Sequence, residues 1–310
     1  MEIFYFQAKY NPVYSKFLQL IDIRPETILS VEDIPYLPVE FFKGHCVSCQ
    51  PVDDQTNVFT SSSTTGVGVS RHYITDLDLY DISSTKSFEF QFGAVEDYTF
   101  RFLLPSYLER NGSSLVYMAQ HFLRKSGKGG FYLNDFDKLA EDIIRDKKNG
   151  NKVMLLGVSF ALMDFAEKYP MDLSNLIIME TGGMKGRRRE MTRGELHSFL
   201  KQKWNANQIA SEYGMTELLS QAYSIRDGIF KCPPWMKISI GQTTDPFGLE
   251  KIGKTGTIKI MDLANINSCC FISTSDLGRV YEDGSFEVLG RFDNSDVRGC
   301  NLLTPAPFDK

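Results

Sequence analysis

The sequence predicts an α/β protein in which a parallel sheet with flanking helices is followed by a smaller β-rich subdomain. Two observations predict this fold class. Continuous apolar runs at residues 153–158 and 176–179 enclose a helix-like segment, which is the β-α-β rhythm of a parallel sheet. Beyond about residue 228 the apolar runs are short, alternate with polar residues and are separated by turns, as in antiparallel β structure.

The first fifty residues predict a helical lead-in followed by extended connections. Aromatic residues are frequent in this segment, and Pro25, Pro35 and Pro38 interrupt its second half. Two strands are then predicted on either side of a hydroxyl-rich string at residues 60–66.

Besides the helix-like segment at residues 161–168, three helices are predicted within the α/β core, each by a capping residue and an apolar face. They begin at Ser113 or Ser114, at Asp135, and at Thr192, where Glu195 completes the spacing of a capping box. A glycine at residue 150 stops the second helix, and the third ends near residue 204.

The remaining strands follow the last of these helices. Residues 208–210 return the chain to the sheet, and residues 257–261, 269–274 and 279–289 form β structure, the last as a hairpin that turns at Asp283-Gly284. We therefore expect an α/β core with its lead-in at residues 1–228, a β-rich subdomain at 229–292 and a C-terminal tail at 293–310.

Composition and charge argue against several classes of protein. The 34 lysines and arginines face 39 aspartates and glutamates, giving a net charge of −5 and no basic stripe of the kind that binds nucleic acid. The longest apolar stretch is broken by Ser159 and Asp164, so no membrane span is expected. The N-terminus carries no export signal, and six cysteines are too few for a disulfide scaffold, which favours the cytoplasm.

A run of six hydroxyl residues is the most unusual local feature of the chain. Thr60 begins it, and Ser61, Ser62, Ser63, Thr64, Thr65 and Gly66 follow. Hydroxyls and backbone N–H groups suit a phosphate chain, although the Gly-Lys-Ser/Thr ending of a Walker loop is missing. Taken alone, such a string is also typical of a solvated turn.

Three further strings follow in a fixed order. They are SEYGMTE at residues 211–217, TSDLG at 274–278 and GRFD at 290–293. The four strings together resemble the adenylate-forming superfamily of acyl-CoA synthetases and phenylacetate-CoA ligases. Longer strings resemble most closely the acyl-protein synthetase (LuxE-type) family, and they lie at residues 104–110, 180–187, 211–220, 232–236 and 296–300.

The resemblance implies a role for each matching residue in binding ATP and Mg²⁺. The hydroxyl loop, Ser61 to Gly66, would cover the ATP phosphates. Tyr213 would stack on adenine, Thr216 would bond the α-phosphate, Glu217 would hold Mg²⁺, Asp276 would take the ribose hydroxyls and Arg291 would reach ribose or phosphate. Gly182, Gly183 and Gly214 complete the implied nucleotide site.

Each of these residue types also has a structural interpretation. Glu217 could be a helix N-terminal carboxylate, Asp276 part of a turn, and Tyr213 a core aromatic residue. Ser63 stands where many relatives have glycine, which changes the expected mobility of the loop.

The C-terminal tail departs from the acyl-CoA synthetases. They continue past the Gly-Arg-x-Asp string into a lid domain, whereas only residues 292–310 follow Arg291 in this chain, so we expect the lid to be absent. Acyl-protein synthetases share the early end and accept the acyl group on a cysteine near the C-terminus, which Cys300 matches. A small buried hydrophobe is the alternative interpretation of Cys300.

The resemblance thus implies a ligase that activates a fatty or other carboxylic acid with ATP. Acyl-AMP would form first, and a thiol, Cys300 by preference, would take the acyl group for delivery to an acyl-CoA reductase-like partner. Two alternatives stay open: a ligase that loads CoA or a carrier protein in trans, and a nucleotide-binding scaffold subunit without catalysis.

Overall fold

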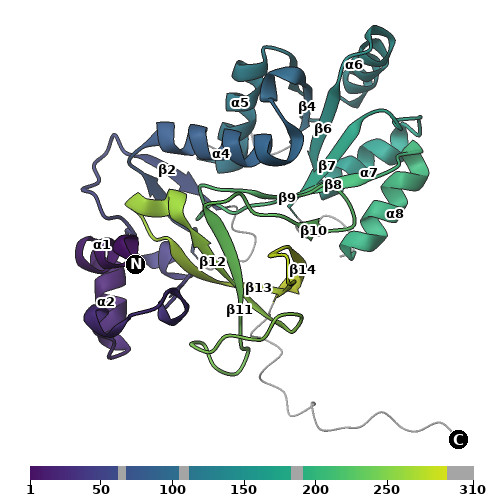
Figure 1. Ribbon diagram of the computed structural model, residues 1–310. Coiled ribbons are helices and arrows are strands. Elements are labelled where there is room, and N and C mark those ends of the chain that lie inside the picture. Colours follow the sequence, from purple (N-terminus) through teal and green to yellow (C-terminus); the bar gives the residue numbers. More distant parts are fainter. Residues whose placement is uncertain (62–67, 105–111, 183–190, 292–310) are drawn as a thin grey trace, which may run out of the picture.

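The computed structural model describes residues 1–61, 68–104, 112–182 and 191–291. Within them the chain forms two six-stranded sheets and a two-stranded ribbon (Figure 1). The two larger sheets have separate hydrophobic cores. The predicted fold class is confirmed: a mostly parallel sheet with flanking helices is followed by an antiparallel sheet.

The first sheet carries the α/β core. Its strands, in spatial order, are β5 (Gly129–Phe131), β4 (Thr99–Leu103), β6 (Val153–Val158), β7 (Ile177–Thr181), β8 (Ile209–Tyr213) and β9 (Ala222–Ser224). All neighbours pair in parallel except β8 with β9. Strand β6 is buried along its whole length, which explains its continuous apolar run.

Helices cover both faces of this sheet. Helices α4 (Leu77–Phe92) and α5 (Ser114–Ser126) lie on one side, and α6 (Phe136–Asn149), α7 (Ser159–Lys168) and α8 (Arg193–Trp204) lie on the other (Figure 1). The three predicted helix starts are confirmed: Ser113 caps α5, Asp135 caps α6, and Thr192 with Glu195 forms a capping box on α8. Gly150 ends α6 in the left-handed conformation.

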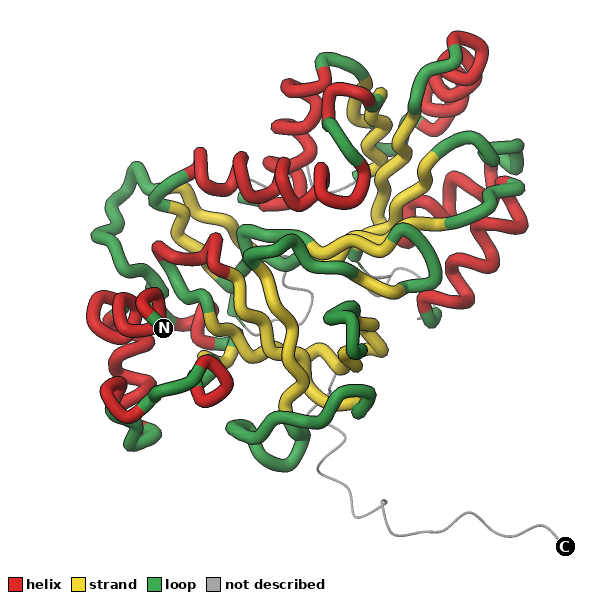
Figure 2. The backbone as a smooth tube through the Cα atoms, in the orientation of Figure 1, coloured by secondary structure: helices red, strands yellow, loops and turns green. Residues whose placement is uncertain are grey.

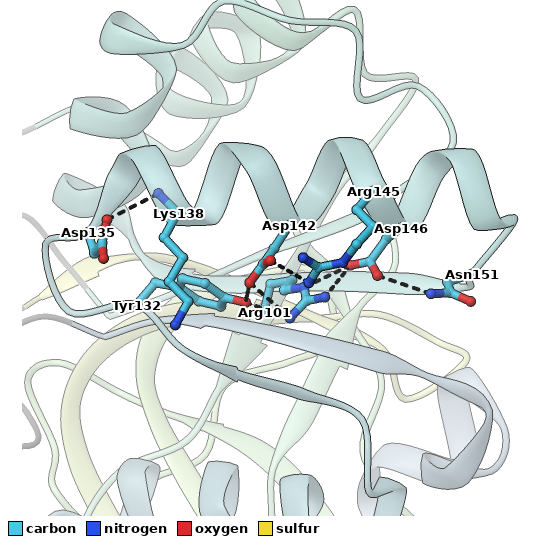
Figure 3. Close-up of polar contacts among 8 residues, drawn as sticks. All are labelled: Arg101, Tyr132, Asp135, Lys138, Asp142, Arg145, Asp146 and Asn151. Atoms are coloured by element: carbon cyan, nitrogen blue, oxygen red, sulfur yellow. Dashed lines mark hydrogen bonds and ion pairs between the residues drawn. The ribbon is translucent and has the colours of Figure 1, made fainter.

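A buried ion-pair network fixes α6 to the sheet edge (Figure 3). Arg101 on β4 donates from Nε to Asp146 Oδ2 at 2.8 Å, and its Nη1 reaches the hydroxyl of Tyr132, which donates onward to Asp142. Because each charge has a partner, the buried guanidinium is tolerated on an otherwise apolar strand. This network lies away from the four motif strings.

The second sheet is antiparallel and follows the first in sequence. Its strands run in the order β10 (Ile229–Phe230), β14 (Phe286–Arg291), β13 (Phe271–Val280), β12 (Thr255–Asp262) and β11 (Met236–Gly241). The predicted hairpin is confirmed, with Gly284 in its turn at φ +78°. Figure 2 shows that loops rather than long helices border most of this sheet.

The N-terminal segment packs against the second sheet. Its elements are α1 (Glu2–Tyr10), α2 (Pro12–Leu20), the 3-10 turns η1 (Pro25–Thr27) and η2 (Val31–Asp33), β1 (Leu37–Pro38) and α3 (Phe41–Gly44). Strand β1 pairs in parallel with β13. The buried Gln7 amide donates to the carbonyls of Asn265 and Ile266 at 3.0 Å, so polar as well as apolar contacts hold the lead-in helices in place.

A two-stranded ribbon, β2 (Asn57–Thr60) and β3 (Arg71–Ile74), connects the lead-in to α4 and confirms the two strands predicted around the hydroxyl string. Two short 3-10 segments, η3 (Val95–Asp97) and η4 (Leu263–Asn267), complete the elements of the described residues. None of the helices described is both long and apolar enough to cross a bilayer.

Candidate active site

A cavity of about 370 Å³ lies where the two sheets meet. Seven residues singled out from the sequence line it together: Ser61, Gly182, Gly214, Thr216, Glu217, Asp276 and Arg291. They come from segments that are up to 230 residues apart in the chain, and only folding brings them to one place. The cavity adjoins the carboxyl ends of β7 and β8, where open α/β sheets place their ligands.

The other predicted site residues are not among the described residues that line this cavity. Ser62, Ser63, Thr64, Thr65, Gly66, Gly183 and Cys300 lie outside the described residues, so their roles stay predictions. Tyr213 is described, and it lies behind the cavity.

Tyr213 is packed on two neighbouring aromatic rings. Its ring centroid lies 5.6 Å from that of Phe286 and 6.0 Å from that of Phe230, and only 8% of the residue is exposed. Its hydroxyl donates to Asp276 Oδ2 at 2.8 Å. In this structure Tyr213 therefore supports Asp276, and stacking on adenine stays a prediction.

Asp276 and Arg291 face each other on neighbouring strands. They are paired in the register of β13 and β14, at the end of the hairpin that reaches the cavity. Burial raises the pKa of Asp276, although the Tyr213 hydroxyl and the charge of Arg291 oppose that rise. The pair presents an acceptor and a cation side by side, which suits a ribose and a phosphate.

The loop after β8 carries Thr216 and Glu217, and a buried histidine holds its backbone. His72 is 1% exposed, and burial lowers its pKa to about 4, so the ring is neutral. Its Nδ1 donates to the carbonyl of Thr216 at 3.0 Å, while Nε2 accepts from Ser268 Oγ at 2.8 Å. Asn265 Nδ2 donates to the next carbonyl, that of Glu217, at 2.8 Å.

The Glu217 carboxylate lies in the wall of the cavity, and it suits a hard cation. The residue is 7% exposed, and burial raises its pKa, while the Ser70 hydroxyl and the charges of Arg291 and Lys43 act in the opposite direction. Among the described residues no cluster of three or more His, Cys, Asp or Glu is placed to hold a metal. Mg²⁺ commonly uses one or two carboxylates together with substrate phosphates, so this donor set fits it.

Hydrogen bonds fix the start of the hydroxyl string, and Ser70 beyond it, at the cavity. The Ser61 N–H donates to the Ser70 carbonyl at 3.1 Å, and the Ser70 N–H donates to Ser61 Oγ at 3.0 Å. The Thr60 N–H donates to the Gly112 carbonyl at 2.7 Å. The β2–β3 ribbon therefore presents this segment to the cavity beside Glu217.

A buried polar network supports Gly182 from the opposite face of the sheet. Gly182 has φ +68°, a conformation that favours glycine, and its carbonyl accepts from Ser159 Oγ at 2.9 Å. Glu180 lies behind it and accepts from Arg193 Nε at 3.1 Å. Burial alone would raise the pKa of Glu180, but His197 and Arg193 outweigh that effect and lower it.

Four cavity residues carry chemistry that the sequence analysis did not single out: Glu40, Lys43, Glu212 and Gln221. Lys43 packs beside Gly68, and Glu40 accepts a hydrogen bond from Ser275 Oγ at 2.9 Å. No motif marks the two N-terminal residues. Glu212 lies inside the SEYGMTE string, where an acidic residue in a largely buried strand was the available signal.

No family model matches the chain. Solved structures share its fold. The 2-hydroxyisobutyryl-CoA ligase in complex with 2-HIB-AMP matches 94% of this chain and 66% of its own, with a TM-score of 0.73 and 13% identity. ATP-bound MatB from Rhodopseudomonas palustris matches 76% of this chain, with a TM-score of 0.59 and 16% identity. The chain spans about half the length of MatB and about two thirds of the other ligase. The fold is that of the N-terminal domain of adenylate-forming ligases.

Two curated proteins are similar in sequence to this chain over nearly its whole length. The long-chain-fatty-acid–luciferin-component ligase of Vibrio harveyi is 23% identical over 325 residues, which cover 96% of this chain and 84% of that protein. The protein of the same name from Aliivibrio fischeri is 22% identical, with 97% and 85% covered. The chain is therefore a distant homologue of the LuxE-type ligases over nearly its whole length, and the resemblance stated from the motifs is confirmed.

Proposed function

We propose that this chain is an ATP-dependent ligase that converts a carboxylic acid to acyl-AMP and then transfers the acyl group to a thiol. The observation that carries the proposal is the convergence of residues from all four motif strings on one cavity. Distant homology to LuxE-type ligases supports acyl adenylation, and the ATP-bound relative of the same fold supports the use of ATP.

In the proposed first step the carboxylate of the acid attacks the α-phosphorus of ATP, and pyrophosphate leaves. Thr216 is held by His72 and would orient the α-phosphate, while Arg291 would balance the negative charge that grows on the phosphoryl oxygens. Asp276 would accept hydrogen bonds from the ribose hydroxyls. Mg²⁺, bound by Glu217 together with phosphate oxygens, would supply further charge neutralisation.

In the proposed second step a thiolate attacks the acyl carbonyl, a thioester forms, and AMP leaves. Cys300 is our candidate for this thiol on the strength of its motif, residues 296–300. The acyl group would then pass to an acyl-CoA reductase-like protein in the cytoplasm. A fatty acid is the substrate class that the LuxE-type relatives favour.

ATP–pyrophosphate exchange tests the first step. We expect exchange that depends on an added carboxylic acid and that Glu217→Ala abolishes. Acid-dependent exchange would exclude a scaffold without catalysis, whereas nucleotide binding without any exchange over a broad panel of acids would contradict the proposal.

Protein labelling tests the second step. Incubation with ATP and a radiolabelled acid should label the chain through a hydroxylamine-sensitive bond, and Cys300→Ser should abolish the label. Cys46→Ser is the matched control, because Cys46 is an exposed free cysteine outside the cavity lining. Unchanged labelling of Cys300→Ser, or label found only on CoA or a carrier protein, would remove Cys300 from the mechanism and favour transfer in trans.

A further inference from the structure

The cavity has a second end, which the phosphate-binding motifs do not explain. Thr216, Asp276 and Arg291 gather at one end. The other end lies between β8 and the helices α4 and α5, and Tyr80, Leu115 and Met118 line it. An acid whose carboxylate lies next to the α-phosphate must extend the rest of its structure into this second end.

Two polar side chains meet at this second end, over the backbone of Gly214. A methyl group built on Gly214 would overlap Glu212 Oε1 and would lie 3.3 Å from Gln221 Cγ. Both residues therefore converge on one spot, and glycine at 214 leaves the room for them. Both residues also line the cavity.

Gln221 is a buried amide without a complete set of partners. The residue is 3% exposed, and its Oε1 has no hydrogen-bond partner among the described residues. Its backbone is held firmly, because the preceding Ser220 donates from Oγ to Asp262 Oδ1 at 2.6 Å and β9 begins at the next residue. A buried amide oxygen without a partner is unfavourable, so this position calls for a donor from a ligand.

Among the residues that the structure describes, one hydrogen bond reaches the carboxyl group of Glu212. Thr181 Oγ1 donates to its Oε2, while Oε1 points over Gly214 toward Gln221. Burial raises the pKa of Glu212 to about 7, so near neutral pH the carboxyl group both donates and accepts. A hydroxyl group can complement both Glu212 and Gln221, because it donates one hydrogen bond and accepts others.

We propose that the acid activated by this chain carries a hydrogen-bond-donating substituent, a hydroxyl group in the first instance, which pairs with Gln221 Oε1 and Glu212. The inference rests on the proposed function and names its substrate class. An unsubstituted alkyl chain would leave Gln221 Oε1 without a partner and would cover Glu212 without offering it a hydrogen bond. A site built to hydrogen-bond its substrate rejects analogues that lack the bonding group.

The test is ATP–pyrophosphate exchange by the full-length wild-type chain with matched acids. Each unsubstituted acid, from four to sixteen carbons, is compared with acids of equal length that carry one hydroxyl or one amino group at varied positions. We expect at least one hydroxylated acid to exceed its unsubstituted partner by about tenfold or more in kcat/KM. An equal or better response to every unsubstituted acid would overturn the inference and leave the adenylation proposal standing.

Two variants connect the preference to the two residues. Gln221→Leu should lower kcat/KM for the preferred hydroxylated acid about tenfold and reduce its advantage over the unsubstituted acid, with KM for ATP unchanged. Glu212→Gln should keep the preference for the hydroxylated acid. If the wild-type chain instead prefers an amino-substituted acid and Glu212→Gln removes that preference, the donor is an ammonium group paired with the carboxylate. An unchanged preference in Gln221→Leu would overturn the inference. Absence of exchange with every acid in the wild-type chain would instead contradict the proposed function.

Discussion

The two ends of the cavity differ in whether their residues belong to sequence motifs. The end proposed to bind the nucleotide consists of short strings that stand at the ends of strands, such as the segments containing Thr216, Asp276 and Arg291. The end proposed to bind the acyl group, called the acyl end below, contains Gln221, Met118 and Tyr80, which belong to no recognisable string. A chemistry shared by many ligases leaves a motif, whereas the choice of one acid depends on individual side chains. Mutations at the two ends should therefore have separable effects.

The largest effect is expected at the nucleotide end, from Asp276→Asn. Loss of the charge that would hold the ribose should lower kcat/KM for ATP by about a hundredfold or more, while the amide still accepts from the Tyr213 hydroxyl. The change in kcat/KM for ATP is measured by steady-state exchange kinetics at varied ATP concentrations. Tyr213→Phe is the matched control, because it removes the hydrogen bond between Tyr213 and Asp276 and keeps the Asp276 carboxylate. An equal loss in Tyr213→Phe would mean that Asp276 acts by positioning.

Gly214→Ala should disturb the acyl end strongly. The added methyl group would overlap Glu212 Oε1 and push it and Gln221 apart, so we expect kcat/KM for the acid to fall by about thirtyfold. Gly194→Ala is the control, since nothing lies within 4 Å of a methyl group there. If KM for ATP changed as much as KM for the acid, the two ends would not be separable.

The carboxyl of Glu212 should make stability depend on pH. Its folded pKa of about 7 lies above the usual 4.5, so the folded chain binds the proton more tightly than the unfolded chain does. The free energy of unfolding should therefore decrease as pH rises from about 5 to 8, by about 1 to 3 kcal/mol relative to Glu212→Gln. Urea unfolding of both proteins at several pH values measures the difference. Parallel pH profiles would show that Glu212 titrates normally.

The smallest effect is expected for Lys43→Ala. Lys43 is an exposed cation at the rim of the nucleotide end, near Glu217, so its removal should raise KM for ATP by about threefold to tenfold and less at high salt. Lys237→Ala on β11 is the control, because Lys237 is exposed outside the cavity lining. An equal effect of both variants would show that only overall charge matters.

Much of the fold followed from the sequence, but α4 did not. Its buried side chains include Ser83, Ser84, Thr85 and Ser87, so no apolar stripe marks a helix. Ser83 Oγ lies 2.9 Å from Ser220 Oγ, which shows that this helix packs partly through hydroxyl contacts. Helices α5, α6 and α8 were predicted because their caps and apolar faces are local features.

The candidate site likewise contains residues that the sequence predicts and residues that it does not. Its motif residues could be predicted individually, whereas the position of Tyr213 behind Asp276 depends on packing against Phe230 and Phe286 from distant strands. The role of His72 was equally invisible, because its partners Thr216 and Ser268 are 144 and 196 residues away. Long-range hydrogen bonds of this kind leave no pattern along the chain.

Arg193 joins the two halves of the molecule at the floor of the site. Its Nε donates to Glu180 on β7, its Nη1 donates to the Val288 carbonyl on β14 at 3.0 Å, and its guanidinium lies 4.9 Å from the centre of the Phe230 ring. A hinge motion between the halves would have to break the contacts with Val288 and Phe230 together, because Arg193 itself belongs to the α/β core. Arg193 thus ties to the α/β core the strand that carries Arg291, three residues beyond Val288.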